Sequence, residues 1–131
     1  IPAERMKMKD QHIVPLSHQA IKILRELQKH SGNRQHLFPN QHKPAKYMSE
    51  NTMLYALYRK GYHSRTTGHG FRATASTILN EHGFRPDVIE RQLAHCERNK
   101  VRAAYNHAQY LPERRKMMQW WADYLDGVRK G

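Results

Sequence analysis

The apolar residues of this chain recur at spacings of three and four, in stretches separated by glycine and proline. This pattern is typical of amphipathic helices and limits the fold more than any other feature of the sequence. It predicts helices at about residues 17–32, 49–61, 70–82, 86–95 and 99–105, and a last one from residue 112 onward. Ser17 and Ser49 stand where helix caps are expected, and Gly32, Gly61 and Gly83 stand where helices end.

The first sixteen residues have a different pattern. Residues 6–9 and 12–16 predict two short strands joined at Asp10 and Gln11, with Pro15 restricting the second strand to an edge. Residues 32–47 predict a long loop that Phe38 attaches to the core. We therefore expect a mostly α fold with a small N-terminal β-hairpin, an α+β class. Residues 1–131 would form a single domain, with the hairpin in 1–16 and the helical part in 17–131.

Charge points to a polyanionic partner. The 131 residues include 23 Lys and Arg against 11 Asp and Glu, which gives a net charge of +12 and a pI near 10.1. Nucleic acid is the simplest such partner, although an ordinary basic surface would have the same composition. The single cysteine, Cys96, excludes an internal disulfide and suggests a reducing compartment. No apolar run is long enough to span a bilayer, no signal peptide is present, and the start at Ile1-Pro2 suggests a fragment.

Five residues together suggest phosphoryl transfer without a metal. His69 and Arg72 are three positions apart at a predicted helix start, where backbone N–H groups and the helix dipole favour a phosphate. Lys7 could protonate a leaving oxygen, and His95 could hold the phosphate. Tyr105 could be the nucleophile if a base or cationic pocket activates it.

Each of these residues also has an ordinary structural interpretation. His69 and Arg72 could be incidental to a helix start, and Lys7 could be a solvated strand lysine. His95 could cap a helix C-terminus, and Tyr105 could be a core tyrosine packed beside Val101. The hypothesis of a catalytic site therefore depends on the combined pattern.

Three motifs in a fixed order resemble the tyrosine recombinases, most closely those of prophages and genomic islands. They are Thr67-Gly-His-Gly-Phe-Arg-Ala-Thr-Ala-Ser76, then Leu93-Ala-His95, then Asn99-Lys-Val-Arg-Ala-Ala-Tyr-Asn-His107. Residues 6–17 are similar to the hairpin segment of that family, and Leu37-Phe-Pro39 to one of its loops. The resemblance covers essentially the whole chain, and the three motifs are highly specific together.

The resemblance implies a role for each catalytic candidate. Lys7 corresponds to the general acid that protonates the 5′-hydroxyl leaving group, with Lys9 as the alternative. His69 corresponds to a base or phosphate ligand, Arg72 to the second catalytic arginine, and His95 to a phosphate ligand. Tyr105 corresponds to the nucleophile, which in the family forms a 3′-phosphotyrosine link to DNA.

The same resemblance implies site-specific DNA recombination, meaning integration and excision of a prophage or island, with no metal and no cofactor. The partner would be double-stranded DNA at attachment sites, contacted also by Lys9, Arg65, Lys100 and Arg102. We also expect a homotetramer on DNA, accessory DNA-bending proteins, and a cytoplasmic, nucleoid-associated location without membrane contact. The tetramer would form through the terminal helix, whose stripe of Met117, Trp120, Trp121 and Tyr124 would otherwise be core.

Two departures from the family pattern affect this interpretation. Tyr105 follows His95 by ten residues, one more than is common, so Tyr110 is the rival nucleophile. The first catalytic arginine belongs well upstream of the hairpin, and Arg5 is too close to fill that role. We therefore expect the C-terminal portion of a catalytic domain, inactive alone.

Two other functions remain open at this point. A non-enzymatic basic DNA-binding module would account for the charge and for the absent arginine. A metal-dependent nuclease is suggested by the ten histidines, although they lack tight ligand spacing and an accompanying carboxylate cluster.

Overall fold

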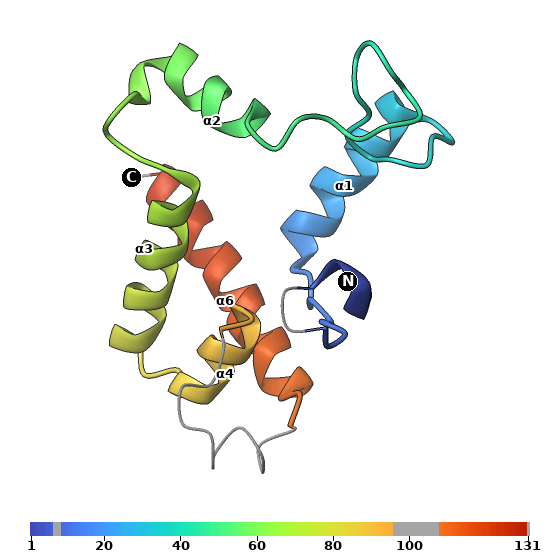
Figure 1. The fold of residues 1–131 in the computed structure, drawn as a ribbon. Helices are drawn as coiled ribbons and strands as arrows, with labels where there is room; N and C mark the ends of the chain where they lie inside the picture. Colours follow the sequence, from blue (N-terminus) through green and yellow to red (C-terminus); the bar gives the residue numbers. More distant parts are fainter. Residues whose placement is uncertain (7–8, 96–107, 131) are drawn as a thin grey trace. The chain divides into compact units, whose positions relative to one another are not determined.

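The computed structural model describes residues 1–6, 9–95 and 108–130, and in these ranges the chain is mostly helical (Figure 1). The chain divides into two compact units. Unit 1 comprises Ile1–Ser17 and Ala75–Gly131, and unit 2 comprises His18–Thr74. The mostly helical class expected from the sequence is therefore observed. The expectation of a single domain stays a prediction.

Unit 2 begins with α1 (His18–Ser31), which starts directly after Ser17, as the expected cap position requires. A loop follows, held by one antiparallel bridge between Pro39 and Tyr47, in agreement with the expected long loop. The next helix is α2 (Thr52–Leu57), which continues into one π-helical turn, η2 (Tyr58–Tyr62). Gly61 has φ 84° in this turn, a left-handed conformation that glycine adopts without steric cost.

Helix α3 (Gly68–Glu81) spans the boundary of the two units, and the remaining helices belong to unit 1. Helix α4 (Pro86–Gln92) has proline in its first turn and Asp87 beside the positive end of its dipole. Helix α6 (Leu111–Lys130) begins one residue before the expected start. The predicted helix at 99–105 lies outside the described residues.

The core described in unit 1 forms where α3, α4 and α6 meet. Its buried side chains are Leu79, Val88, Ile89 and Met117, each at most 3% exposed. Five partly buried residues pack against them: Phe84, Leu93, Tyr110, Trp120 and Trp121. Burying a side chain of this size contributes about 1.5–3 kcal/mol relative to exposure, so this small core is the main apolar contribution visible in unit 1.

The aromatic stripe of α6 packs within its own chain. The Trp120 ring lies 4.6 Å from the His82 ring and 5.2 Å from the Phe84 ring, centroid to centroid. Tyr124 stacks on Trp120 and Trp121 at interplanar angles of 19° and 16°. The side of α6 that carries these rings is therefore covered by the end of α3 and the turn that follows it.

The N-terminal β-hairpin expected at residues 6–16 is not seen in the described part of that segment. A short 3₁₀ turn, η1 (Ala3–Arg5), is followed by chain without strand geometry. Reciprocal backbone hydrogen bonds join Ile1 and His12, at 2.7 Å and 3.0 Å, so the segment closes into a loop. A two-stranded hairpin is marginal without a third strand or a helix to cover it, which accounts for the difference.

Phe38 is 43% exposed, so the expectation that it attaches the loop to the core was wrong. Met53 in α2 and Phe71 in α3 are exposed as well, at 64% and 56%. Phe38 lies in the loop beside the Pro39 bridge, whose backbone hydrogen bonds order the loop without it. Among the described helices, none is both long and apolar enough to cross a membrane.

Candidate active site

The first turns of α3 carry His69 and Arg72 on one helix. The Thr67 hydroxyl accepts a hydrogen bond from the Gly70 N–H at 3.1 Å, which caps the helix start. Helix α3 begins two residues earlier than expected, so His69 falls in its first turn, where backbone N–H groups lack helical partners. His69 is exposed and Arg72 is half-buried. The structure therefore places these two residues three positions apart at a helix N-terminus, as predicted.

His95 lies just beyond α4, and a carboxylate contacts its ring. Its Nδ1 is 2.6 Å from Oε2 of Glu90, and its backbone N–H donates to the Glu90 carbonyl at 3.0 Å. Ala94, with φ 49°, turns the chain between the helix end and His95. Because a carboxylate only accepts hydrogen bonds, Nδ1 is the donor, and the ring orientation is defined. The sequence analysis missed Glu90, although its position on the same turn of chain could have indicated it.

The structure describes only some of the other predicted site residues. Four lie outside the described residues: Lys7, Lys100, Arg102 and Tyr105. Lys9 is exposed with φ 58°, and Arg65 is exposed in the turn after η2. The structure thus places His69 and Arg72 in the first turns of the same helix, and it places His95 in contact with Glu90.

Tyr110, the rival nucleophile, is half-buried and packs against the core of unit 1. The Arg85 guanidinium carbon lies 5.2 Å from the centre of its ring, a cation–π distance. Nη1 of Arg85 in turn donates to both oxygens of the Glu113 carboxylate, at 3.1 Å and 3.2 Å. These contacts are those of a packed aromatic residue.

A buried polar cluster lies beside this core, and the sequence analysis did not foresee it. Arg114 is 0% exposed. Its Nε donates to the Gln92 side-chain oxygen at 2.9 Å, its Nη1 to the Gln109 carbonyl at 3.2 Å, and its Nη2 to the Ile13 carbonyl. His12, 7% exposed, places its Nε2 3.2 Å from the Gln92 carbonyl. We refer to these five residues as the Arg114 cluster.

Both ionisable members of the Arg114 cluster are affected by burial. Burial lowers the pKa of the Arg114 guanidinium, and repulsion from Arg91 lowers it further. Burial also lowers the pKa of the His12 imidazole below its ordinary 6.5, and the positive charge of Arg114 acts in the same direction. His12 is therefore neutral at pH 7.

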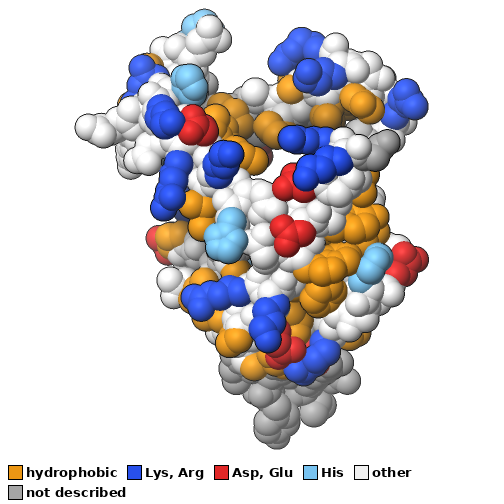
Figure 2. Space-filling view, turned by 180° about the vertical axis from the view of Figure 1, so that it is seen from behind, with side chains coloured by type: hydrophobic (Ala, Val, Ile, Leu, Met, Phe, Trp, Pro, Cys, Tyr) orange, Lys and Arg blue, Asp and Glu red, His pale blue; other side chains and the backbone are white. Residues whose placement is uncertain are grey.

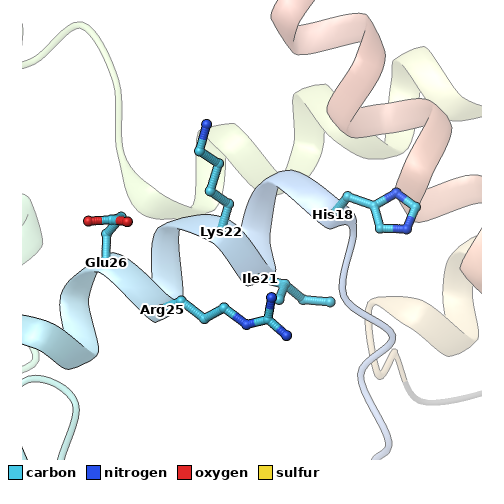
Figure 3. A pocket seen from close by; sticks show the side chains of 5 residues that line it. All are labelled: His18, Ile21, Lys22, Arg25 and Glu26. Atoms are coloured by element: carbon cyan, nitrogen blue, oxygen red, sulfur yellow. The ribbon is translucent and has the colours of Figure 1, made fainter.

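Basic side chains are spread over the face shown in Figure 2, with fewer acidic ones between them. One pocket, of about 320 Å³, is lined by His18, Ile21, Lys22, Arg25 and Glu26, all from α1 (Figure 3). The catalytic candidates are not in this lining. Among the described residues, no group of three His, Cys, Asp or Glu side chains is placed to hold a metal ion.

Comparison with known proteins defines the family. Residues 1–111 match the model of the phage integrase family. The chain is 56% identical over 125 residues to the integrase of Enterobacteria phage P4, covering 92% of this chain and 28% of that protein. It is 50% identical over 131 residues to the prophage integrase IntA of Escherichia coli K12, covering 100% and 32%. The Shigella phage Sf6 integrase is 45% identical over 127 residues, covering 96% and 33%.

The chain therefore belongs to the phage integrase family. It spans about a third of the length of these relatives. No solved structure matches it significantly.

Proposed function

We propose that the complete protein is a tyrosine-type site-specific recombinase that integrates and excises a prophage or genomic island. The observation that carries the proposal is the placement of His69 and Arg72 at the start of α3, in a chain of the phage integrase family. A guanidinium and an imidazole in the first turns of a helix, at the positive end of its dipole, suit a DNA phosphate that must be bound and made reactive.

The proposed cleavage step exchanges one phosphodiester for another. The Tyr105 oxygen attacks the phosphorus, and its proton passes to a base, for which His69 is the candidate. The bond from phosphorus to the 5′-oxygen breaks, and Lys7 protonates that oxygen, with Lys9 as the alternative. The products are a 3′-phosphotyrosine and a free 5′-hydroxyl. Attack by a 5′-hydroxyl of another strand reverses the step, so the reaction needs no external energy.

Arg72 and His95 would stabilise the charge that develops on the non-bridging oxygens. One such preorganised donor contributes about 10²–10³ in rate. The Glu90 contact occupies Nδ1 of His95, so Nε2 is the ring atom that would meet the phosphate. Arg65, Lys9, Lys100 and Arg102 would contact DNA around the cleavage point.

The proposal also covers the oligomer that the protein forms on DNA and its domain organisation. Recombination requires two duplexes, so we infer a homotetramer on attachment-site DNA, assembled through α6 and aided by DNA-bending proteins in the bacterial nucleoid. The exposed end of α6 supports this, since Leu125 is 47% and Val128 63% exposed. We also infer that residues 1–131 lie within a single catalytic domain of the complete protein.

A covalent-capture experiment tests the proposal and identifies the attachment site at the same time. The complete tagged protein is incubated with sheared genomic DNA from the cells that encode it, denatured in detergent, and purified. Nuclease digestion and mass spectrometry should find a deoxynucleotide on Tyr105, and sequencing of the attached DNA should define one site. Detergent-resistant DNA that persists in Tyr105→Phe would contradict the proposal.

The second candidate is a non-enzymatic DNA-binding module, favoured by the net charge of +12. Such a protein would bind duplex DNA with an affinity that falls with salt, by a logarithmic slope of about −0.9 per phosphate neutralised. It would leave no adduct in the capture experiment, which separates the two functions.

A further inference from the structure

Arg114 is an unusual residue to find fully buried. All three groups that accept its hydrogen bonds are neutral: the Gln92 side chain and the Gln109 and Ile13 carbonyls. Removing a charge from water costs several kcal/mol, and an apolar residue of similar volume at such a site is often as stable or more so. Packing alone therefore gives no reason for an arginine in this turn of α6.

The geometry of the guanidinium gives a better reason. Its donors lie in one plane and point in fixed directions, so three acceptors bound to it are held in a fixed relation to each other. Here the acceptors come from three separate stretches: Ile13 near the N-terminus, Gln92 at the end of α4, and Gln109 just before α6. All three stretches belong to unit 1.

Gln92 strengthens this connection because it is bound twice. Its side-chain oxygen accepts from Arg114, and its backbone carbonyl lies 3.2 Å from Nε2 of His12. His12 also exchanges two backbone hydrogen bonds with Ile1. The N-terminal stretch is thus attached to the end of α4 through His12 and to α6 through Ile13.

Each of the three stretches leads directly to a proposed catalytic residue. Lys7 precedes His12 by five positions, His95 follows Gln92 by three, and Tyr105 precedes Gln109 by four.

We propose that Arg114 is a positioning residue of the recombination site. It fixes the relative positions of Ile13, Gln92 and Gln109, which belong to the stretches of chain that carry Lys7, His95 and Tyr105. The inference rests on the proposed function. Arg114 is 0% exposed, so its side chain acts through the chain segments that it joins and does not contact DNA. A misplacement of reacting groups by about 1 Å can reduce a rate by about 10²-fold, which is the scale of the expected effect.

The test separates the rate of chemistry from binding and folding. Complete proteins carrying Arg114→Met, Arg114→Lys or Arg115→Met are compared on the DNA site recovered by covalent capture. Arg115 is the matched control, because it is the adjacent arginine and is exposed. Three quantities are measured: the single-turnover rate of adduct formation, the Kd for the same DNA, and the midpoint of thermal unfolding.

Arg114→Met should slow adduct formation about 10²-fold while the Kd stays within threefold of wild type. Arg114→Lys should recover part of that loss, because an ammonium can reach one or two of the three acceptors. Arg115→Met should form the adduct within threefold of the wild-type rate. If Arg114→Met slows adduct formation no more than Arg115→Met, or if all of its loss appears in the Kd, Arg114 has no positioning role.

A second variant covers the case in which Arg114→Met does not fold. Gln92→Met keeps the approximate length of the side chain and removes its amide, including the oxygen that accepts from Nε, and it should slow adduct formation about tenfold. A wild-type rate in this variant would overturn the proposal. Failure of the proposed function looks different, because the wild-type protein would then give no Tyr105-dependent adduct at all.

Discussion

Nδ1 of His95 and Oε2 of Glu90 lie 2.6 Å apart, a charge-assisted contact between a predicted phosphate ligand and a residue five positions before it. Both side chains are substantially exposed, at 39% and 50%, so the pair contributes at most about 1 kcal/mol to stability. Its effect on ring orientation matters more, since a ring held through Nδ1 directs Nε2 away from the carboxylate.

Replacing Glu90 should therefore change the rate of DNA cleavage more than the stability. Glu90→Ala is expected to slow adduct formation about tenfold, and Glu90→Gln less, because the amide oxygen can still accept from Nδ1. Glu113→Ala, which removes another exposed carboxylate of unit 1, is the control. Single-turnover cleavage measures all three, and equal rates for Glu90→Ala and Glu113→Ala would show that the contact has no role in catalysis.

The two tyrosines near the start of α6 should behave in opposite ways. Tyr105→Phe is expected to abolish the covalent adduct, because phenylalanine has no oxygen to attack phosphorus. Tyr110→Phe should retain adduct formation within a few-fold, since its ring packs on the core and beneath Arg85. Gel analysis of detergent-treated reactions distinguishes them. An adduct in Tyr105→Phe combined with none in Tyr110→Phe would reverse the assignment.

The identity of the general acid can be tested through the leaving group. A DNA substrate with sulfur in place of the bridging 5′-oxygen releases a thiolate, which needs no protonation because a thiol has a pKa of about 8.5. Lys7→Ala should be slow on ordinary DNA by about 10²–10⁴ and nearly normal on the sulfur substrate. Lys9→Ala is the comparison, and the opposite result would assign the role to Lys9.

Local sequence signals predicted the helices well and the interior less well. Ser17, Pro86 and the glycine stops located α1, α3 and the start of α4 to within about two residues, whereas α4 ends three residues before its predicted end and α2 begins three residues after its predicted start. These signals act within one turn of chain, so they can be read without knowing the fold. The expected hairpin depends instead on what covers its strands, and Phe38 and Phe71 would need partners that no local pattern reveals.

In the candidate site, too, relations between neighbouring residues could be predicted and relations between distant residues could not. His69 and Arg72 are close in sequence and lie on one helix, so their spacing alone predicted their relation. The Arg114 cluster joins residues up to 101 positions apart. Helical spacing places Arg114 on the same face as Met117, unlike Arg115, but it does not show which distant groups accept the hydrogen bonds of the guanidinium. Long-range hydrogen bonds of this kind become visible only when the packing of α4 and α6 is known.

Shortening a side chain at the centre of the unit 1 core should lower the free energy of unfolding. Met117 is 0% exposed among Leu79, Val88 and Ile89, so Met117→Ala is expected to lower the free energy of unfolding by about 2–5 kcal/mol. Met53→Ala, at a site 64% exposed, should change it by less than about 0.5 kcal/mol. Urea denaturation of the 131-residue chain is followed by fluorescence, because both tryptophans lie on α6. Similar costs at the two methionines would contradict this core.

Acidification should weaken unit 1 through His12. Its pKa is lowered below 6.5 by burial and by Arg114, so just below pH 6.5 the unfolded chain binds a proton that the folded chain does not. The stability that His12 contributes is therefore complete above about pH 6.5 and decreases as the pH falls toward the folded-state pKa. His12→Gln keeps a donor for the Gln92 carbonyl and cannot titrate in this range. In urea titrations, the free energy of unfolding of the wild-type chain minus that of His12→Gln should be larger at pH 7.5 than at pH 5. A difference that stayed constant or grew on acidification would contradict a neutral, buried His12.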